Sequence, residues 1–176
     1  MSDEELIALA AQLAAEAVQL RRGGPFGAVI ARGGEVLATG QNRVLATGDP
    51  TAHAEIEAIR NAAAGLFPDT LTLVPRPAGS DDPAAHRSRM LMGYTIYASG
   101  FPCPMCMSAI YWARLHGLIF ACSVEDARNI GFDDAHQYRD FGRPITARRI
   151  PVRQLGRADG LAAFALWDNT SDRHPY

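Results

Sequence analysis

Residues 94–123, YTIYASGFPCPMCMSAIYWARLHGLIFACS, decide the fold of this chain. YTIYASG (94–100) is rich in β-branched and aromatic residues, which favours a strand. CPMCMSAIYWARLHG (103–117) predicts a helix that Gly117 is placed to end, and LIFACS (118–123) predicts a short buried strand. Cys103 directly follows Pro102, Cys106 lies two residues after Pro104, and both cysteines lie where the first expected strand ends and the helix begins. The stretch therefore predicts a strand, a helix and a second strand, with two thiols at the start of the helix.

The remainder of the chain continues the alternation of strands and helices. Residues 2–21 are expected to form an amphipathic helix, with Ser2 and Glu5 as a capping box. The other expected elements are two strands of a hairpin within 23–40 around an RGGE turn, a loop over 41–51, a helix over 52–66, a short helix over 124–132, a strand near 149–152 and a closing helix over 160–169. This order predicts an α/β fold with three α/β/α layers, in which helices flank a central mixed sheet of about five strands.

The length of 176 residues suits a single domain spanning 1–176. Residues at about 68–93 contain several prolines and lack a steady hydrophobic period. We interpret them as a long surface insertion that acts as a lid or an oligomer contact, or else as a mobile segment.

The composition excludes several classes of protein. A hydrophobic content of 48% with 20% charged residues indicates a globular chain rather than a disordered one. A net charge of −2 gives no general attraction to nucleic acid or to an anionic membrane. No apolar run reaches the roughly 20 residues of a membrane-spanning helix. The acidic N-terminus lacks a cationic leader, and three cysteines fit reduced thiols, so we expect a cytoplasmic protein.

The cysteine pair allows three interpretations. A redox pair requires a thioredoxin-like setting, which the order of elements does not supply. Two buried core thiols are an alternative, although the flanking prolines favour a fixed helix start. A metal site requires a further ligand, and His53, in TAHAE at the start of another expected helix, supplies it. The remaining histidines are less well placed: His86, His116, His136 and His174.

Two thiolates and one imidazole suit zinc, which prefers tetrahedral sites with sulfur and nitrogen ligands. Three protein ligands leave a fourth position for water, as in a catalytic site, whereas a structural site would use a fourth cysteine or histidine. Cys122 is the spare thiol. We expect it to be a small core residue of its strand, with a role as the fourth ligand as the alternative.

Glu55 lies two residues after His53. Zinc lowers the pKa of its water towards neutrality, and a nearby carboxylate can take that proton and return it to the substrate and the leaving group. The alternative is a glutamate that the helix dipole favours at a helix N-terminus. Together with the cysteine pair, these residues form the H-x-E…P-C-x-x-C pattern of zinc-dependent nucleobase deaminases.

On these residues the chain resembles the cytidine deaminase-like superfamily, and within it the bacterial guanine deaminases. The matching stretches are GGPFGAVI, GQN, DPTAHAEI, AIR, PCPMC, AIYWAR and GFDD, with a terminal tyrosine. The zinc motif is that of the superfamily, whereas GQN, GFDD and the terminal tyrosine point to the guanine-deaminating branch. The resemblance implies a cytidine deaminase-like fold, bound zinc without an organic cofactor, and hydrolysis of guanine to xanthine and ammonia in purine metabolism.

The resemblance also implies roles for particular residues. They are His53, Cys103 and Cys106 as zinc ligands, Glu55 as proton shuttle, Asn42 as a hydrogen-bond partner of the base, Phe26 and Trp112 as pocket walls, and Asp134 as an aid to substrate recognition and ammonia movement. Tyr176 would reach the partner's active site in a homodimer that exchanges C-terminal segments at about 158–176. Each assignment has a structural alternative, since Asn42 could hold its turn and the two aromatic residues could belong to the core.

Phe101 departs from the family, which usually has an acidic residue before the proline. The change makes this rim of the pocket apolar and leaves the substrate open. The alternatives to guanine are another amino-heterocycle (a guanosine or adenosine nucleoside, cytosine, a pterin or a triazine), the adenosine of a tRNA, and a non-catalytic role as a zinc-binding partner protein. The net charge disfavours tRNA, and intact Glu55 disfavours a purely structural site.

Overall fold

The computed structural model describes residues 1–66 and 90–171. Within these residues the chain divides into two compact units, one formed by 1–66 with 90–135 and the other by 136–171. The first unit contains the sheet and every residue of the predicted metal centre. The predicted insertion at about 68–93 lies largely outside the described residues.

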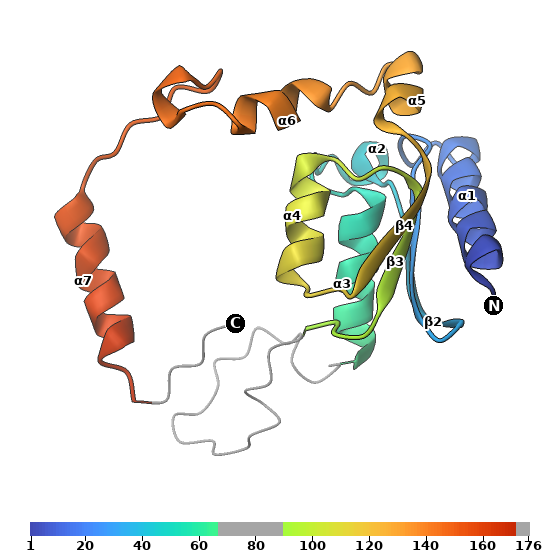
Figure 1. Cartoon of the computed structure of the whole chain (residues 1–176), viewed down its shortest axis with the longest axis horizontal. Coiled ribbons are helices and arrows are strands. Elements are labelled where there is room, and N and C mark those ends of the chain that lie inside the picture. The colour runs from blue at the N-terminus through green and yellow to red at the C-terminus, as the bar shows by residue number, and fades with distance from the viewer. Residues whose placement is uncertain (67–89, 172–176) are drawn as a thin grey trace. The chain divides into compact units, whose positions relative to one another are not determined.

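The sheet of the first unit has four strands: β1 (Gly27–Arg32), β2 (Glu35–Gln41), β3 (Thr95–Gly100) and β4 (Gly117–Cys122). Their order across the sheet is β2-β1-β3-β4 (Figure 1). β1 pairs antiparallel with both β2 and β3, whereas β3 and β4 run parallel. The predicted mixed sheet is therefore confirmed, with four strands in place of about five.

Helices cover both faces of this sheet (Figure 1). Helix α1 (Asp3–Gln19) packs on one face, where Leu6 and Ala10 meet Val29 and Tyr97. Helices α3 (Ala54–Leu66) and α4 (Pro104–Trp112) pack on the opposite face. Their buried residues and the strand residues beneath them form one apolar cluster: Ala28, Ile30, Ala54, Ala58, Ala62, Leu91, Ile96, Ile110 and Ala113. Because side chains of a strand alternate between its faces, the two clusters confirm the predicted three-layer α/β/α fold.

A glycine on β2 sets how closely α3 can approach the sheet. A Cβ atom at Gly40 would lie 2.1 Å from the carbonyl oxygen of Ala54, at the start of α3. A larger residue would push this end of the helix away from the strand. The absence of a side chain at Gly40 therefore helps to place the N-terminus of α3, where His53 and Glu55 lie.

Contacts at the start of α1 link the N-terminus to the sheet. The capping box is present as predicted, since Glu5 N donates to Ser2 Oγ at 3.3 Å and Ser2 N donates to Glu5 Oε2 at 2.7 Å. In the next residue, Asp3 Oδ1 accepts a hydrogen bond of 2.6 Å from the hydroxyl of Tyr97 on β3. Helix α1 is thus tied to β3 by a polar contact as well as by its apolar face.

Three predicted features of the first unit are wrong in detail. The loop over 41–51 contains a short helix, α2 (Val44–Thr47). Helix α4 ends at Trp112 rather than near Gly117, because Arg114 adopts a left-handed conformation with φ of 52°. Strand β4 is not buried: its last three residues are exposed, because β4 lies at an edge of the sheet. The short helix after β4 is confirmed as α5 (Val124–Asn129).

The second unit is helical where the chain is described. It holds α6 (Ala135–Phe141, which begins at the boundary), a 3-10 turn at Ile145–Ala147 and α7 (Arg157–Asp168). The closing helix is confirmed as α7, but the strand predicted near 149–152 is wrong. The backbone N–H of Arg149 donates to the Asp140 carboxylate at 3.0 Å, and Pro151 has no N–H to donate. In neither unit does a described helix have the length and apolar character needed to cross a bilayer.

Candidate metal centre and active site

The three predicted metal ligands meet at the ends of two helices. His53 directly precedes α3, Cys103 is the N-cap residue of α4 and Cys106 lies in the first turn of that helix. Nδ1 of His53 lies 3.6 Å from the sulfur of Cys103 and 3.5 Å from the sulfur of Cys106. All three donor atoms lie within 4.8 Å of one another. The predicted convergence of a distant imidazole with the cysteine pair is confirmed.

This donor set fits zinc in both geometry and chemistry. Zinc bonds sulfur at about 2.3 Å and imidazole nitrogen at about 2.0–2.1 Å, so a tetrahedral site places these donors about 3.6 Å apart. The observed separations of 3.5 and 3.6 Å agree with that value. Hydrogen bonds from Cys106 and His53 lower the pKa of Cys103 to about 4, whereas the pKa of Cys106 is raised because its thiol is the donor to Cys103. The pair thus favours one thiolate, and a bound metal would displace the remaining proton.

Glu55 lies in the first turn of α3 beside this cluster. Its side chain is buried, with 6% of the residue exposed, and its carboxyl group interacts with the thiol of Cys106. Burial raises the pKa of this carboxyl above its ordinary value. A carboxyl group that holds its proton more tightly than usual is suited to both accepting and donating one near neutral pH.

Asn42 is held by two backbone donors. It follows β2 directly, is buried, and its Oδ1 accepts hydrogen bonds of 3.2 Å from Gly24 N and from Val44 N. Because both donors go to the oxygen, the amide nitrogen is the end of the side chain that can donate to a ligand. A Cβ atom at Gly23 would lie 2.0 Å from Oδ1, so only glycine fits there. The structure therefore shows the turn-holding role of Asn42, and its contact with substrate stays a prediction.

An aromatic pair joins two loops of the site. The rings of Phe26 and Phe132 meet edge to face with centroids 4.9 Å apart. Phe132 belongs to GFDD, and a Cβ atom at Gly24 would lie 2.8 Å from its ring. Sequence reasoning missed Phe132 as a site residue, although the GFDD stretch itself was singled out. Its partner Phe26 is remote in the chain, and no local pattern predicts such a pair.

Asp134, two residues after Phe132, affects the pKa of His53 through its negative charge. The pKa of His53 is raised chiefly by its hydrogen bond to Cys103, and in smaller part by the carboxylates of Glu55 and Asp134. Asp134 is half-buried. The structure thus brings the second acid of GFDD within electrostatic reach of His53, at the end of the loop that Phe132 fixes.

Comparison with known proteins identifies the family to which this chain belongs. Residues 1–122 match the family model described as the cytidine and deoxycytidylate deaminase zinc-binding region. The chain belongs to this deaminase family. The deaminase is 38% identical over 176 residues to a guanine deaminase of Bacillus subtilis (strain 168), with 100% of both chains covered. The predicted superfamily, zinc as cofactor and hydrolytic enzyme class are therefore confirmed.

Solved structures agree with this assignment. The X-ray structure of guanine deaminase from Bacillus subtilis matches with a TM-score of 0.84, covering 100% of this chain and 99% of that one. A guanine deaminase from Nitrosomonas europaea, 26% identical, matches with a TM-score of 0.59 and covers 92% and 72% of the two chains. In sequence, the chain is also similar to a tRNA-specific adenosine deaminase of Haemophilus influenzae, with 31% identity over 75% of this chain and 68% of that protein.

One predicted pocket residue, Trp112, lies apart from this cluster. Trp112 is the last residue of α4, at the opposite end of that helix from Cys103, and it is 67% exposed. With Ser108, Tyr111 and Arg114 it lines a cavity of about 260 Å³. Tyr176 lies outside the described residues. The substrate roles of Trp112 and Tyr176 stay predictions.

The departure from the family at Phe101 has a structural setting. Its ring meets that of Phe120 on β4 edge to face, with centroids 5.0 Å apart, and its backbone N–H donates to the carbonyl of Cys122 at 2.8 Å. Phe101 therefore extends an apolar surface from β4 to the start of the cysteine motif. Cys122 itself is exposed, so its expected place in the core is wrong, for the same reason that the end of β4 is uncovered.

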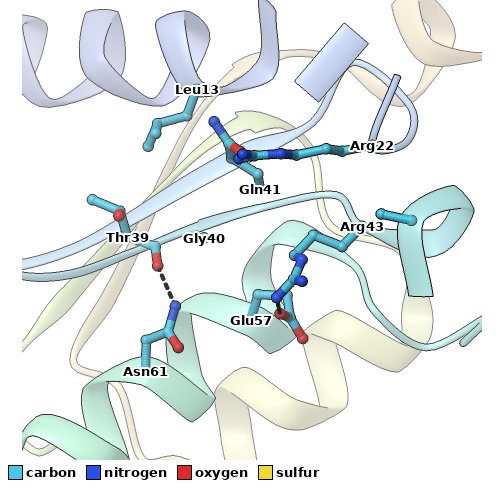
Figure 2. Close-up of a pocket in the computed structure, with 9 residues that line it drawn as sticks. Leu13, Arg22, Thr39, Gly40, Gln41, Arg43, Glu57 and Asn61 are labelled. Atoms are coloured by element: carbon cyan, nitrogen blue, oxygen red, sulfur yellow. Dashed lines mark hydrogen bonds and ion pairs between the residues drawn. The ribbon is translucent and has the colours of Figure 1, made fainter. Parts of the chain in front are cut away.

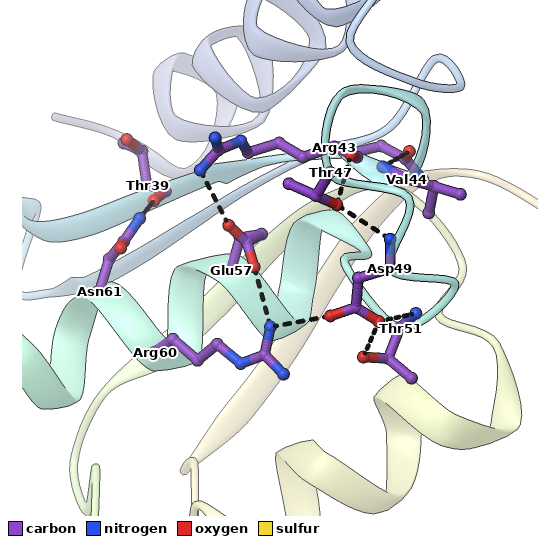
Figure 3. A network of polar contacts seen from close by, with 10 residues as sticks. Thr39, Arg43, Val44, Thr47, Asp49, Thr51, Glu57, Arg60 and Asn61 are labelled. Carbon is purple, nitrogen blue, oxygen red and sulfur yellow. Dashed lines mark hydrogen bonds and ion pairs between the residues drawn. The ribbon is translucent and has the colours of Figure 1, made fainter. Parts of the chain in front are cut away.

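A polar network holds the loop between Asn42 and His53 (Figure 3). Arg43 N donates to the carbonyl of Ala52 at 2.9 Å, which closes the loop at its base. The Asp49 carboxylate accepts from the backbone N–H and the hydroxyl of Thr51, at 2.8 and 2.7 Å. These short contacts fix the chain on both sides of the loop, so the backbone reaches His53 in a defined position.

Ion pairs fasten the same loop to α3. One carboxylate oxygen of Glu57 lies 3.5 Å from Nη1 of Arg43, and the other lies 3.1 Å from Nη1 of Arg60 (Figure 3). Nη1 of Arg60 also lies 3.8 Å from the carboxylate of Asp49. Glu57 lies two residues after Glu55 on α3. Because exposed ion pairs contribute little singly, the network matters chiefly for position: it relates the loop that carries Asn42 to the helix that carries Glu55.

Proposed function

We propose that this protein is a zinc-dependent guanine deaminase, which hydrolyses guanine to xanthine and ammonia. The observation that carries the proposal is the convergence of His53 Nδ1 with the sulfurs of Cys103 and Cys106 beside a buried carboxyl group. The full-length likeness to a guanine deaminase of Bacillus subtilis supports guanine among the substrates that a deaminase of this family could take.

His53, Cys103 and Cys106 would hold the zinc ion. When bound, zinc lowers the pKa of a water ligand towards neutrality, so that a nucleophile is available at cellular pH. Glu55 takes the proton of the attacking water and delivers it to a ring nitrogen of the base. A C2–O bond forms, Glu55 carries the remaining proton of that oxygen to the exocyclic nitrogen, the bond from C2 to this nitrogen breaks, and the amine leaves as ammonia.

Asn42, Phe26 and Asp134 are the proposed substrate contacts. The amide nitrogen of Asn42 points away from its two backbone donors and can donate to an acceptor on the base. The ring of Phe26, fixed by Phe132, supplies an apolar wall for a planar heterocycle. Asp134 accepts from the substrate or from departing ammonia, consistent with its electrostatic reach to His53.

A homodimer with exchanged C-terminal segments at about 158–176 belongs to the same proposal. Each unit exposes aromatic side chains: Trp112 and Tyr111 are 67% and 77% exposed on α4, and Phe164 is 71% exposed on α7. Such residues are common at subunit interfaces. The second subunit would cover Trp112 and bring Tyr176 to the pocket, and the single domain would then comprise 1–176. A cytoplasmic location and a place in purine metabolism complete the proposal.

The test is ammonia release across a panel of purine bases, nucleosides, cytosine, pterins and triazines, with a tRNA substrate as a separate arm. Guanine is expected to give the highest kcat/KM. Faster release from another heterocycle would reassign the substrate and keep the reaction. Release from none of them would favour a non-catalytic zinc protein, and activity on tRNA alone would place the chain with the adenosine deaminases of tRNA.

The dimer has its own measurement. Light scattering after size-exclusion chromatography should give about twice the chain mass of 19.0 kDa. Phe164→Glu should shift the population towards the monomer, because it places a charge in the proposed interface, whereas Glu125→Gln, on the exposed helix α5, should not. A monomeric wild-type protein would contradict the exchange of segments.

A further inference from the structure

A second cavity lies at the end of β2, and its walls include neither the metal ligands nor Glu55 and Asn42 (Figure 2). Its volume is about 500 Å³, within the range of small-molecule sites. Its lining comes from α1, the loop after α1, β2, the start of the segment after β2 with α2, and α3: Leu13, Arg22, Thr39, Gly40, Gln41, Arg43, Ala46, Glu57 and Asn61. A ligand held here would therefore not compete directly for the metal centre.

Two guanidinium groups face this cavity (Figure 2). Arg22 donates from Nη1 to Gln41 Oε1 at 2.7 Å, a neutral amide partner, and that amide in turn donates to Glu16 at 2.9 Å. Arg43 meets Glu57 at 3.5 Å, but Glu57 is shared with Arg60. Glu57 is the one acidic residue among the lining residues, against two arginines. The lining thus carries a net positive charge.

Neither arginine is saturated by these contacts. A guanidinium presents five N–H donors in a rigid fork, and each contact above uses a single nitrogen of its arginine. A fork of this kind matches the oxygens of a phosphate group in two-pronged fashion. The side chain of Arg43 is half exposed, so it can turn towards an anion. Together Arg22 and Arg43 can hold one phosphate group between the loop after α1 and the segment after β2.

The remainder of the cavity suits the organic part of such a ligand. Asn61 donates from its amide nitrogen to the carbonyl of Thr39 at 2.9 Å, which leaves its amide oxygen as an acceptor. Leu13 and Ala46 add apolar surface. A cavity with two guanidinium groups, one amide oxygen that can accept and apolar walls fits a phosphate-bearing heterocycle better than inorganic phosphate alone.

We propose that this cavity is a binding site for a small phosphate-bearing molecule of mononucleotide size, with Arg22 and Arg43 as its phosphate ligands. Gln41 and Arg43 flank Asn42, and Glu57 follows Glu55 on α3, so the site shares two elements with the catalytic centre. The proposal does not depend on which base the enzyme deaminates.

Isothermal titration of the zinc-loaded protein with guanosine 5′-monophosphate tests the site, with guanosine and inorganic phosphate as the two partial ligands. We expect one nucleotide per chain, at least tenfold weaker binding of either partial ligand, and a loss of affinity as salt rises. Arg22→Ala should weaken nucleotide binding at least tenfold while the kcat and KM for deamination stay within twofold. Arg153→Ala, which removes an exposed charge of the second unit, should leave affinity unchanged.

Several results would overturn the proposal. They are the absence of nucleotide binding, equal binding of guanosine, or unchanged affinity in Arg22→Ala. Should Arg22→Ala fail to fold in a thermal melt, Arg43→Gln is read for nucleotide affinity alone, because glutamine can still donate to Glu57 but lacks the charge and the fork of arginine. Loss of nucleotide binding together with loss of deamination would place the nucleotide in the catalytic centre instead.

Discussion

At the scale of single residues, Glu55 combines two properties that both favour its protonated form. It is buried, and it stands beside a cluster of potential thiolates. Both the burial and the negative charge of Cys103 raise the pKa of its carboxyl group. The position of Glu55 therefore favours a role in proton transfer over a purely structural role at the helix N-terminus.

Glu55→Gln should keep zinc and lose deamination. The amide preserves the shape of the side chain but cannot carry a proton, and general acid–base catalysis is worth about 10²–10⁴-fold in rate. The measurement pairs zinc content by atomic absorption with kcat for ammonia release. Glu35→Gln, on the exposed β1–β2 hairpin, is the matched control and should match wild type. Near-normal kcat in Glu55→Gln would remove Glu55 from the mechanism.

Gly23→Ala should raise KM with little change in zinc content. The added methyl group would fall 2.0 Å from Asn42 Oδ1, so the amide must move from its two backbone donors. We expect an increase in KM of about tenfold, equal to about 1.4 kcal/mol of lost substrate contact. Gly65→Ala is the control, because nothing lies near a Cβ atom there. An unchanged KM in Gly23→Ala would argue that Asn42 does not touch substrate.

The residues of the metal centre could be predicted because they lie in two short motifs, and the chemistry of zinc binding requires the residue spacing within each motif. His53 and Glu55 are two residues apart, and so are constrained by one helix start, and the cysteines are constrained by another. Phe132 could not be predicted in the same way. Its contact with Phe26 depends on how the loop after α5 returns to the sheet, which no local pattern encodes.

At the scale of elements, the contact of α1 with β3 is both apolar and polar. Burial, together with the hydrogen bond to Asp3, raises the pKa of Tyr97 to about 12 from an ordinary value of 10.0. Below pH 10 both the folded and the unfolded chain keep this proton. Between pH 10 and about 12 only the unfolded chain loses it, so the stability that Tyr97 contributes is lost as pH rises through this window.

Tyr97→Phe should lower the free energy of unfolding at neutral pH by about 0.5–1.5 kcal/mol, through loss of one hydrogen bond. It should also make stability fall less steeply than in wild type between pH 10 and 12. Urea unfolding at a series of pH values measures both effects. Tyr111→Phe, at a tyrosine that is 77% exposed, is the control. Parallel pH curves for Tyr97→Phe and wild type would contradict the raised pKa.

Element type was easier to predict than element boundaries. The hairpin, α1, α3 and α7 follow from hydrophobic period and capping signals. The end of α4 was missed because Arg114, a residue without glycine's freedom, takes the left-handed conformation that closes the helix. The strand near 149–152 was wrong because a side chain, that of Asp140, takes the N–H group that a neighbouring strand would need.

At the scale of the whole molecule, zinc should stabilise the fold as well as activate it. Its three ligands lie at the N-terminal ends of α3 and α4, which the ion would hold together. A ligand present at 100 times its dissociation constant stabilises by about 2.7 kcal/mol. For a chain of this length that energy corresponds to about 5–11 °C in Tm.

Removal of zinc by a chelator should therefore lower Tm by several degrees and abolish deamination, and added zinc should restore both. Calorimetry with and without chelator measures the shift. Cys122→Ser should behave like wild type, because that thiol is exposed and outside the cluster, whereas Cys106→Ser should lose the response to zinc. A wild-type Tm that is unchanged by the chelator would contradict the stabilisation of the fold by zinc.

The metal ligands and Glu55 lie at the N-terminal ends of α3 and α4, whereas Phe26, Asn42, Phe132 and Asp134 lie in connections elsewhere in the chain. In the proposed mechanism, reactivity and selectivity therefore reside in separate parts of the chain. Changes in the connections can redirect the enzyme towards a different amino-heterocycle while the hydrolytic apparatus is inherited intact. This arrangement offers evolution, or a protein engineer, a scaffold for new deaminases in which only the loops need to be rewritten.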